Sequence, residues 1–70
     1  MDEKIGARVR ELRRQASMNV TDAAMICGLS HNQYLDSESG KRRFSSHELF
    51  KLCDRLDTTL TDILGVLRKP

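Results

Sequence analysis

Four side chains of the kind that can hold a metal ion or attack a substrate are spread through this 70-residue sequence: Cys27, His31, His47 and Cys53. Cys27 and His31 stand four residues apart, as two metal ligands on one helix could, but Gly28 breaks the helix between them. Both cysteines fall on apolar positions of helical patterns, and structural zinc sites usually have tighter paired spacings. We therefore expect two reduced core cysteines rather than a disulfide bridge, and neither a metal nor a cofactor.

The sequence contains no grouped nucleophile, base and acid, and no glycine loop that could cradle a phosphate. Seventy residues form one small core, which rarely encloses a substrate pocket. We predict that the chain is not an enzyme. No stretch is long enough to cross a membrane and the start lacks a secretory signal, so we expect a cytoplasmic protein without membrane contact.

The formal net charge of +2 hides an uneven distribution of charge. Residues 1–16 carry five basic side chains against three acidic ones, and residues 17–40 carry three acids and no lysine or arginine. Three consecutive basic residues then follow, Lys41, Arg42 and Arg43. Basic groups on either side of a neutral-to-acidic middle are compatible with a polyanionic partner but do not establish one.

Apolar spacing and capping residues predict an all-α domain that spans residues 1–70 with helices over about 2–15, 20–27, 31–39 and 46–56, and a fifth segment from about 59. The apolar face of the first helix is predicted to comprise Ile5, Val9, Leu12 and Ala16. Asn19, Ser30 and the S-x-x-E box from Ser45 are suitable N-caps, and Gly28 and Gly40 are suitable stops.

The segment from Asn19 to Gly40 is the most informative part of the chain. A short capped helix meets a tight glycine turn, the apolar turn residue Leu29 and a second capped helix. Such a turn crosses two helices at a steep angle and leaves the start of the second helix protruding, where it could enter a DNA major groove. The capped start of the first helix presents unpaired backbone N–H groups, which suit a phosphate.

Four pieces of sequence, in this order and spacing, carry a resemblance to a known family: IGARVRELR at 5–13, AAMICGLS at 23–30, ESGKRR at 38–43 and SSHELFKLCDRLDTTLTDIL at 45–64. The chain resembles the Cro and lambda-repressor-like (Xre) helix-turn-helix proteins. The resemblance implies a compact five-helix fold with the helix-turn-helix at about 20–39. It also implies a sequence-specific, repressor-like regulator of transcription that binds double-stranded DNA as a homodimer on near-palindromic sites, in association with the nucleoid.

The resemblance also implies which residues touch DNA. Base contacts are expected from four residues of the third helix: His31, Asn32, Gln33 and Asp36. Asn and Gln amides can pair with adenine through two hydrogen bonds, and histidine can donate to guanine. Phosphate contacts are expected from the Val20 backbone N–H, Ser30, Lys41, Arg42 and Arg43.

Two further features follow from the same resemblance. Arg13 of the first helix is expected to form a partly buried ion pair with Glu38 of the third. A possible dimerisation tail at 60–67 is expected to place Val66 and Leu67 in a twofold interface, with a frayed end as the alternative.

Three departures from the family pattern leave a second function open. Val20 stands where the family usually has glutamine, Leu35 and Ser37 exchange the usual polar and apolar positions, and Asp36 is an acid in a helix without basic residues. Tyr34 alone is expected to carry the inward apolar face of this helix. The alternative is a protein-interaction module, such as an antitoxin or adaptor subunit, built on the same scaffold.

Overall fold

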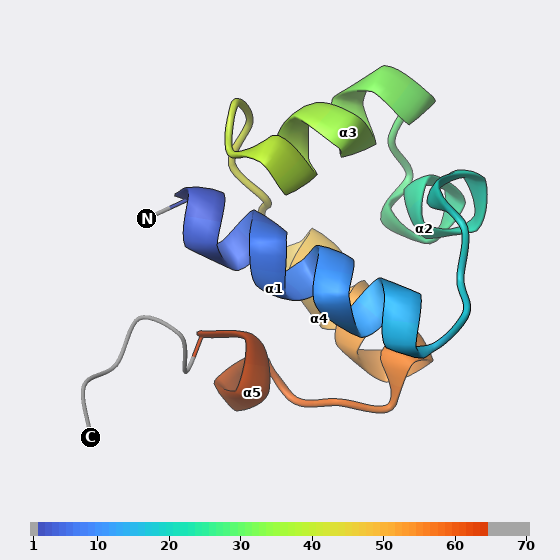
Figure 1. The fold of residues 1–70 in the computed structure, drawn as a ribbon, viewed down its shortest axis with the longest axis vertical. Coiled ribbons are helices and arrows are strands. Elements are labelled where there is room, and N and C mark those ends of the chain that lie inside the picture. Colours follow the sequence, from blue (N-terminus) through green and yellow to red (C-terminus); the bar gives the residue numbers. More distant parts are fainter. Residues whose placement is uncertain (1, 65–70) are drawn as a thin grey trace.

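The computed structural model describes residues 2–64, and this part of the chain is all-helical. It comprises α1 (Asp2–Gln15), α2 (Val20–Cys27), α3 (His31–Ser39), α4 (Ser46–Leu56) and α5 (Leu60–Leu64). α1 runs through the middle of the molecule, with α3 on one side, α5 on the other and α4 behind it (Figure 1). The predicted all-α fold is confirmed, and the first four helices have the predicted bounds.

The helix ends are set by local hydrogen bonds. The Asp22 N–H donates to Asn19 Oδ1 at 2.8 Å, and Ser30 and Ser45 each begin a reciprocal capping box. α2 and α3 end at Gly28 (φ 73°) and Gly40 (φ 89°), in the left-handed region where a side chain is unfavourable. These caps explain why short helices begin and end where the sequence predicts.

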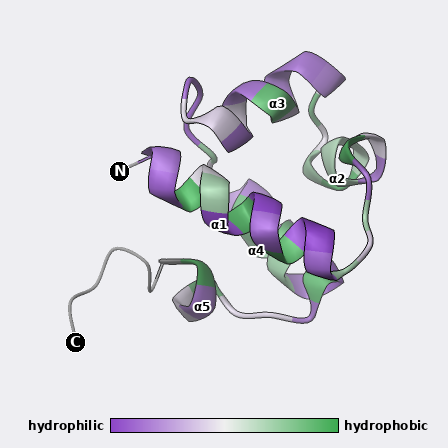
Figure 2. Ribbon diagram, in the orientation of Figure 1, coloured by the Kyte–Doolittle hydropathy of each residue, from purple (hydrophilic) through white to green (hydrophobic). Residues whose placement is uncertain are grey.

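The core lies between α1, α2, α4 and the inner side of α3. Figure 2 shows hydrophobic residues on α1, α2 and α4, and a largely hydrophilic α3. The buried apolar residues are Val9, Ala23, Ala24, Cys27, Tyr34, Phe44, Leu49, Leu52, Cys53 and Ile63. Within residues 2–64, no helix has the length and apolar character needed to span a bilayer.

One detail of the predicted core is wrong. Ala16 is exposed, because α1 ends at Gln15 and the chain turns away there. Val9 is buried as predicted, and the other buried positions of α1 are Gly6 and Arg13, which contact the end of α3. Phe44, in the connection between α3 and α4, is also buried.

Candidate nucleic-acid interface

The two faces of α3 differ sharply in exposure. His31, Asn32 and Gln33 in its first turn are exposed, whereas Tyr34, Ser37 and Glu38 are buried. The helix therefore presents a polar front end to solvent and packs its back against α1 and α2. This is the arrangement that a DNA-reading helix needs, because base edges in the major groove are read by protruding polar side chains.

The packing of α2 lets α3 adopt this position. Ala23 and Ala24 are buried and small, so that α2 can approach its neighbours closely, and Leu29 in the turn is half-buried against the core. At the start of α2, the Asn19 side chain accepts the Asp22 N–H. The Val20 N–H belongs to the first turn, whose N–H groups have no partner within the helix, so it can donate to a phosphate.

Gln33 has a structural task as well as an exposed position. Its Oε1 accepts the Ser30 N–H at 3.0 Å, while its own N–H donates to Ser30 Oγ at 3.1 Å. The capping box thus uses the amide oxygen, which a paired contact with adenine also requires. Asn32, exposed beside it, carries no such capping bond in the described structure, and is the better candidate for an adenine contact.

The buried back of α3 combines one aromatic ring with a polar residue that is fully hydrogen-bonded. The Tyr34 ring packs edge-on against Phe44, with 5.9 Å between ring centroids. Its hydroxyl has no hydrogen-bond partner among residues 2–64, and burial raises the pKa of the phenol. Ser37 Oγ donates to the Gln33 carbonyl at 3.0 Å and accepts from Arg42 Nη1 at 2.9 Å, which explains how a serine is tolerated there.

Arg13 and Glu38 join α1 to the end of α3. Arg13 Nε donates to Glu38 Oε2 at 2.7 Å, and Arg13 Nη2 donates to Oε1 at 3.4 Å. Arg13 Nη1 also donates to the Met18 carbonyl at 2.9 Å. Both side chains are buried, and the hydrogen bond to Glu38 raises the pKa of the guanidinium. The pair expected from the family resemblance is therefore present, and it links the end of α3 to α1.

Arg42 has a different environment from the one expected of a phosphate contact. Its Nη1 and Nη2 donate to the two carboxylate oxygens of Glu48 at 2.9 and 2.8 Å, and Nη1 also reaches Ser37 Oγ. Glu48 Oε1 in turn accepts the Ser45 N–H at 2.9 Å as part of the capping box of α4. Arg42 therefore joins α3 to α4, and we leave it out of the proposed phosphate contacts.

We expect this second ion pair to make stability depend on pH. The hydrogen bond from Arg42 lowers the pKa of Glu48 below its ordinary 4.5, despite the opposing effect of burial. A depressed folded-state pKa adds stability above the ordinary value, and this stability is lost as the pH falls through the folded-state pKa. Glu48→Gln should therefore cost about 1 kcal/mol at pH 7, since the pair is partly exposed. The difference from the parent should shrink below pH 4.5 in urea titrations.

The matched control for Glu48→Gln is Asp54→Asn, an exposed site on the same helix. The single amide oxygen of glutamine can still accept the capping-box hydrogen bond from the Ser45 N–H, while the charge and one of the two hydrogen bonds from Arg42 are lost. An equal loss of stability from the two variants at every pH would rule out the Arg42–Glu48 pair as the source of the pH dependence.

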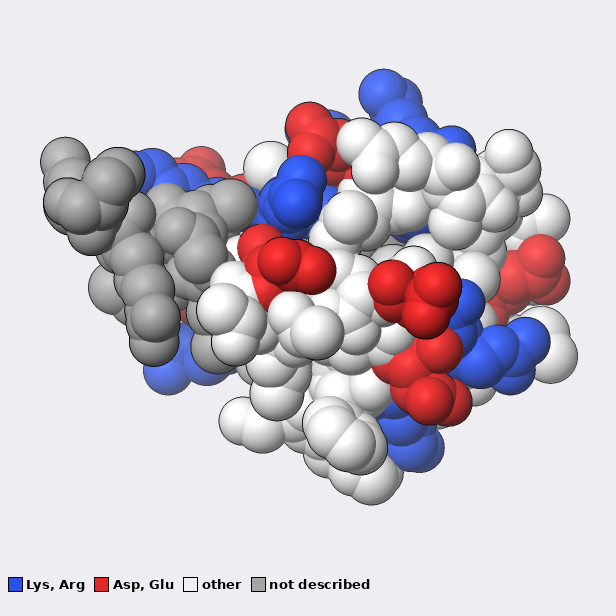
Figure 3. Space-filling model, turned by 90° about the horizontal axis from the view of Figure 1, so that it is seen from below, with Lys and Arg blue, Asp and Glu red and all other residues white. Residues whose placement is uncertain are grey.

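Lys41 and Arg43, on either side of Arg42, remain exposed. Arg43 Nε donates to Asp2 Oδ1 at 3.2 Å, but the Arg43 side chain is open to solvent. An exposed ion pair of this kind is weak and can exchange for a phosphate. On the opposite side of the molecule, beyond α5, acidic and basic side chains are interspersed around a broad uncharged area (Figure 3).

Asp36 and Leu35 are exposed on α3, and 40% of Leu35 is accessible. Asp36 can accept a hydrogen bond, for instance from the amino group of cytosine. Val66 and Leu67, expected at a twofold interface, lie outside the described residues.

Both cysteines occupy core positions, as predicted. Burial raises the pKa of Cys27 to about 11 and also raises that of Cys53, so both thiols are protonated near neutral pH. His31 and His47 are exposed, and no cluster of three metal-binding side chains occurs in residues 2–64.

Comparison with known proteins identifies the family to which the sequence belongs. The family model described as a helix-turn-helix domain matches residues 4–64. The chain therefore belongs to the helix-turn-helix domain family, as its resemblance to Cro-like and lambda-repressor-like proteins implied. Searches of curated proteins and of solved structures gave no significant match.

Proposed function

We propose that this protein is a sequence-specific DNA-binding regulator of transcription. The observation that carries the proposal is the polar first turn of α3, which is exposed while the back of the same helix is buried. Membership of the helix-turn-helix family supports a DNA-binding role in general terms. The protein acts as a cytoplasmic, nucleoid-associated homodimer that represses transcription by occupying a near-palindromic promoter site. It binds DNA and does not catalyse a reaction.

The proposed contacts divide into two groups. Asn32, with His31, Gln33 and Asp36 beside it, reads base edges in the major groove. The Val20 N–H, Ser30, Lys41 and Arg43 hold phosphates on either side of the groove. Base contacts discriminate between sequences, whereas phosphate contacts set affinity and orientation.

Two substitutions should separate these groups. After the preferred site has been selected from random duplex DNA, Asn32→Ala should weaken binding to it by about 5- to 150-fold, the equivalent of about 1–3 kcal/mol. The same change should leave binding to scrambled DNA almost unchanged. Arg43→Ala should weaken both DNAs alike and lower the salt slope by about one. Titration of labelled duplexes at several salt concentrations measures each effect.

Equal binding of the parent protein to selected and scrambled DNA would contradict a sequence-specific role. So would Asn32→Ala and Arg43→Ala variants that both bind as tightly as the parent. Asn32 is preferred to Gln33 for this test because Gln33→Ala also removes half of a capping box.

A protein-interaction module remains the second candidate, because α3 has an exposed acid and an exposed leucine and lacks basic residues. The salt dependence of DNA binding distinguishes the two candidates. A regulator that neutralises several phosphates loses affinity steeply between low and moderate salt, by about 0.9 logarithmic units per phosphate for each tenfold rise. An interaction module should bind DNA weakly at every salt concentration and without sequence preference.

A further inference from the structure

The first turn of α1 brings two acidic side chains next to the basic residues that follow α3. Arg43 Nε donates to Asp2 Oδ1 at 3.2 Å, across 41 positions of sequence. Glu3 lies against the end of α3, since a methyl group at Gly40 would lie 2.9 Å from Glu3 Cα. Both acids border a hollow of about 390 Å³ that Lys41 also lines. The acids therefore lie beside two of the proposed phosphate contacts, Lys41 and Arg43.

We propose that Asp2 limits the affinity of this protein for DNA by occupying Arg43 in the free protein. The inference rests on the proposed function, in which Arg43 holds a phosphate. A carboxylate binds a guanidinium through the same charge and the same kind of N–H donor that a phosphate uses. A phosphate that approached Arg43 with Asp2 still in place would meet a second anion. Arg43 therefore releases Asp2 when it binds DNA, and the loss of the ion pair opposes binding.

The exposure of the two side chains makes this exchange possible. The Arg43 side chain is 81% accessible and that of Asp2 is 30% accessible, so Arg43 can turn toward DNA while Asp2 stays in place. Duplex DNA carries one negative charge per about 1.7 Å of its axis, and this dense charge outcompetes a single carboxylate. After its release, Asp2 remains in the first turn of α1, where the helix dipole favours an acid. The exchange thus costs only the ion pair.

The neighbouring pair of Arg42 with Glu48 is held more firmly. Two hydrogen bonds, at 2.9 and 2.8 Å, join Arg42 to Glu48, and the Glu48 side chain is mostly buried. In residues 2–64, a single hydrogen bond joins Arg43 to Asp2. Paired hydrogen bonds to a carboxylate are stronger than one exposed contact. DNA can therefore displace Asp2 from Arg43, whereas Arg42 stays with Glu48.

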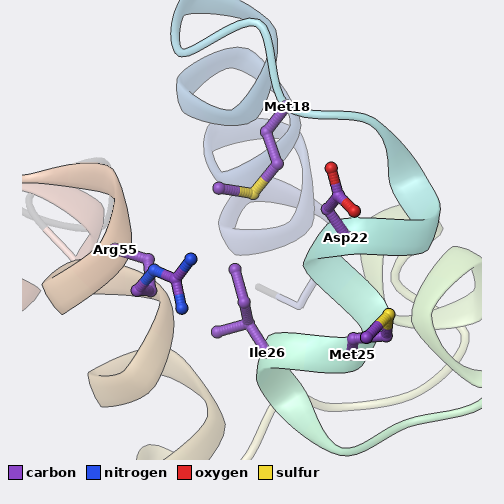
Figure 4. Close-up of a pocket in the computed structure, with 5 residues that line it drawn as sticks. All are labelled: Met18, Asp22, Met25, Ile26 and Arg55. Carbon is purple, nitrogen blue, oxygen red and sulfur yellow. The ribbon is translucent and has the colours of Figure 1, made fainter.

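Two other acids supply matched controls. Glu3 is adjacent to Asp2 in the sequence and is exposed. Asp22, exposed on α2 near the Val20 N–H, borders a hollow of about 300 Å³ that Arg55 of α4 lines from across it (Figure 4). The ion pairs found in residues 2–64 include neither Glu3 nor Asp22. Glu3→Gln and Asp22→Asn therefore remove a negative charge near the proposed phosphate contacts without breaking an ion pair.

The test titrates the selected and the scrambled duplex with the full chain at low salt. Asp2→Asn should tighten binding to both duplexes by about two- to fivefold, the range of an exposed ion pair. Both should gain alike, because phosphates carry no sequence information. Glu3→Gln and Asp22→Asn should give a smaller gain, since they relieve only screened repulsion. In the Arg43→Ala background, the gain from Asp2→Asn should fall to the level of these controls.

A second measurement needs no DNA. The NMR resonance of the Arg43 Nε–H in the free protein should move in the Asp2→Asn variant and stay in place in Glu3→Gln. Thermal melts of all variants show that they remain folded, as expected for changes at surface positions that conserve shape.

An Asp2→Asn variant that binds DNA more weakly than the parent would overturn the inference, since Asp2 would then position Arg43 for its phosphate. The same conclusion follows from a gain no larger than those of the controls, a gain that Arg43→Ala leaves intact, or an Arg43 resonance that does not move. Failure of the proposed function looks different. If neither the parent nor Asp2→Asn binds DNA, the DNA-binding role itself is refuted. If both bind equally well, only the role of Asp2 is refuted.

Discussion

Replacing Arg13 by methionine is expected to remove about 3 kcal/mol of stability, which is most of the margin of a domain this small. The guanidinium supplies two hydrogen bonds to Glu38 and a third to the Met18 carbonyl. Its loss leaves a carboxylate buried without its counter-charge, and desolvation of an unpaired charge is costly. Urea titration followed by circular dichroism should show a large fall in the unfolding midpoint.

A double substitution tests the physical reason for this result. Arg13→Met combined with Glu38→Leu removes both charges, so that no buried carboxylate is left unpaired. The double variant should be more stable than Arg13→Met alone. Arg10→Met, an exposed arginine of the same helix, should have little effect. If Arg13→Met costs no more than Arg10→Met, the pair does not hold α3 against α1.

Gly6→Ala should destabilise the protein by about 2 kcal/mol, through overpacking. A methyl group at Gly6 would lie 2.6 Å from the Ser37 carbonyl oxygen and 2.7 Å from the Glu38 carbonyl carbon. These are backbone atoms at the end of α3, so they cannot move aside without shifting the helix. The better helix propensity of alanine, about 1 kcal/mol, offsets only part of this cost.

Gly28 supplies the contrasting control for the Gly6 prediction. A methyl group at Gly28 would meet nothing within 4 Å, but the positive φ of that residue disfavours any side chain. At Gly28, asparagine should be tolerated better than alanine, because asparagine accepts the left-handed region. At Gly6, stability should fall with side-chain size, from alanine to leucine. A Gly6→Ala variant as stable as the parent in thermal melts would show that α1 and α3 do not approach this closely.

The sequence predicted the helices more completely than the contacts of the candidate interface. Asn19, Ser30, Ser45, Gly28 and Gly40 act on neighbours within a few residues, so that both ends of α2 and α3 and the start of α4 followed from local chemistry. Ala16 was misjudged because its burial depends on where the chain goes after a helix ends. Periodicity alone cannot supply that information.

Arg42 shows the same limit at the candidate site. In the sequence, Lys41, Arg42 and Arg43 are three equivalent basic residues, and all three were expected to meet phosphates. In the structure, Arg42 binds Glu48 and Ser37, while its two neighbours are exposed. The sequence did contain a signal for this ion pair, since Glu48, six residues after Arg42, is the acid of a capping box. Whether Glu48 also binds Arg42 depends on how α3 and α4 approach each other.

Local sequence alone specified which segments become helices, where they are capped and which family they resemble, because these properties depend on residues close together in the chain. Tertiary packing specified which side chains of those helices face solvent. Arg13 and Glu38 are 25 residues apart, and Gly6 and Glu38 are 32 apart, so their contacts exist only once α1 lies across α3. That crossing buries the back of α3 and leaves Asn32 exposed. Because one side of α3 is packed against the core, only its other side can contact a binding partner.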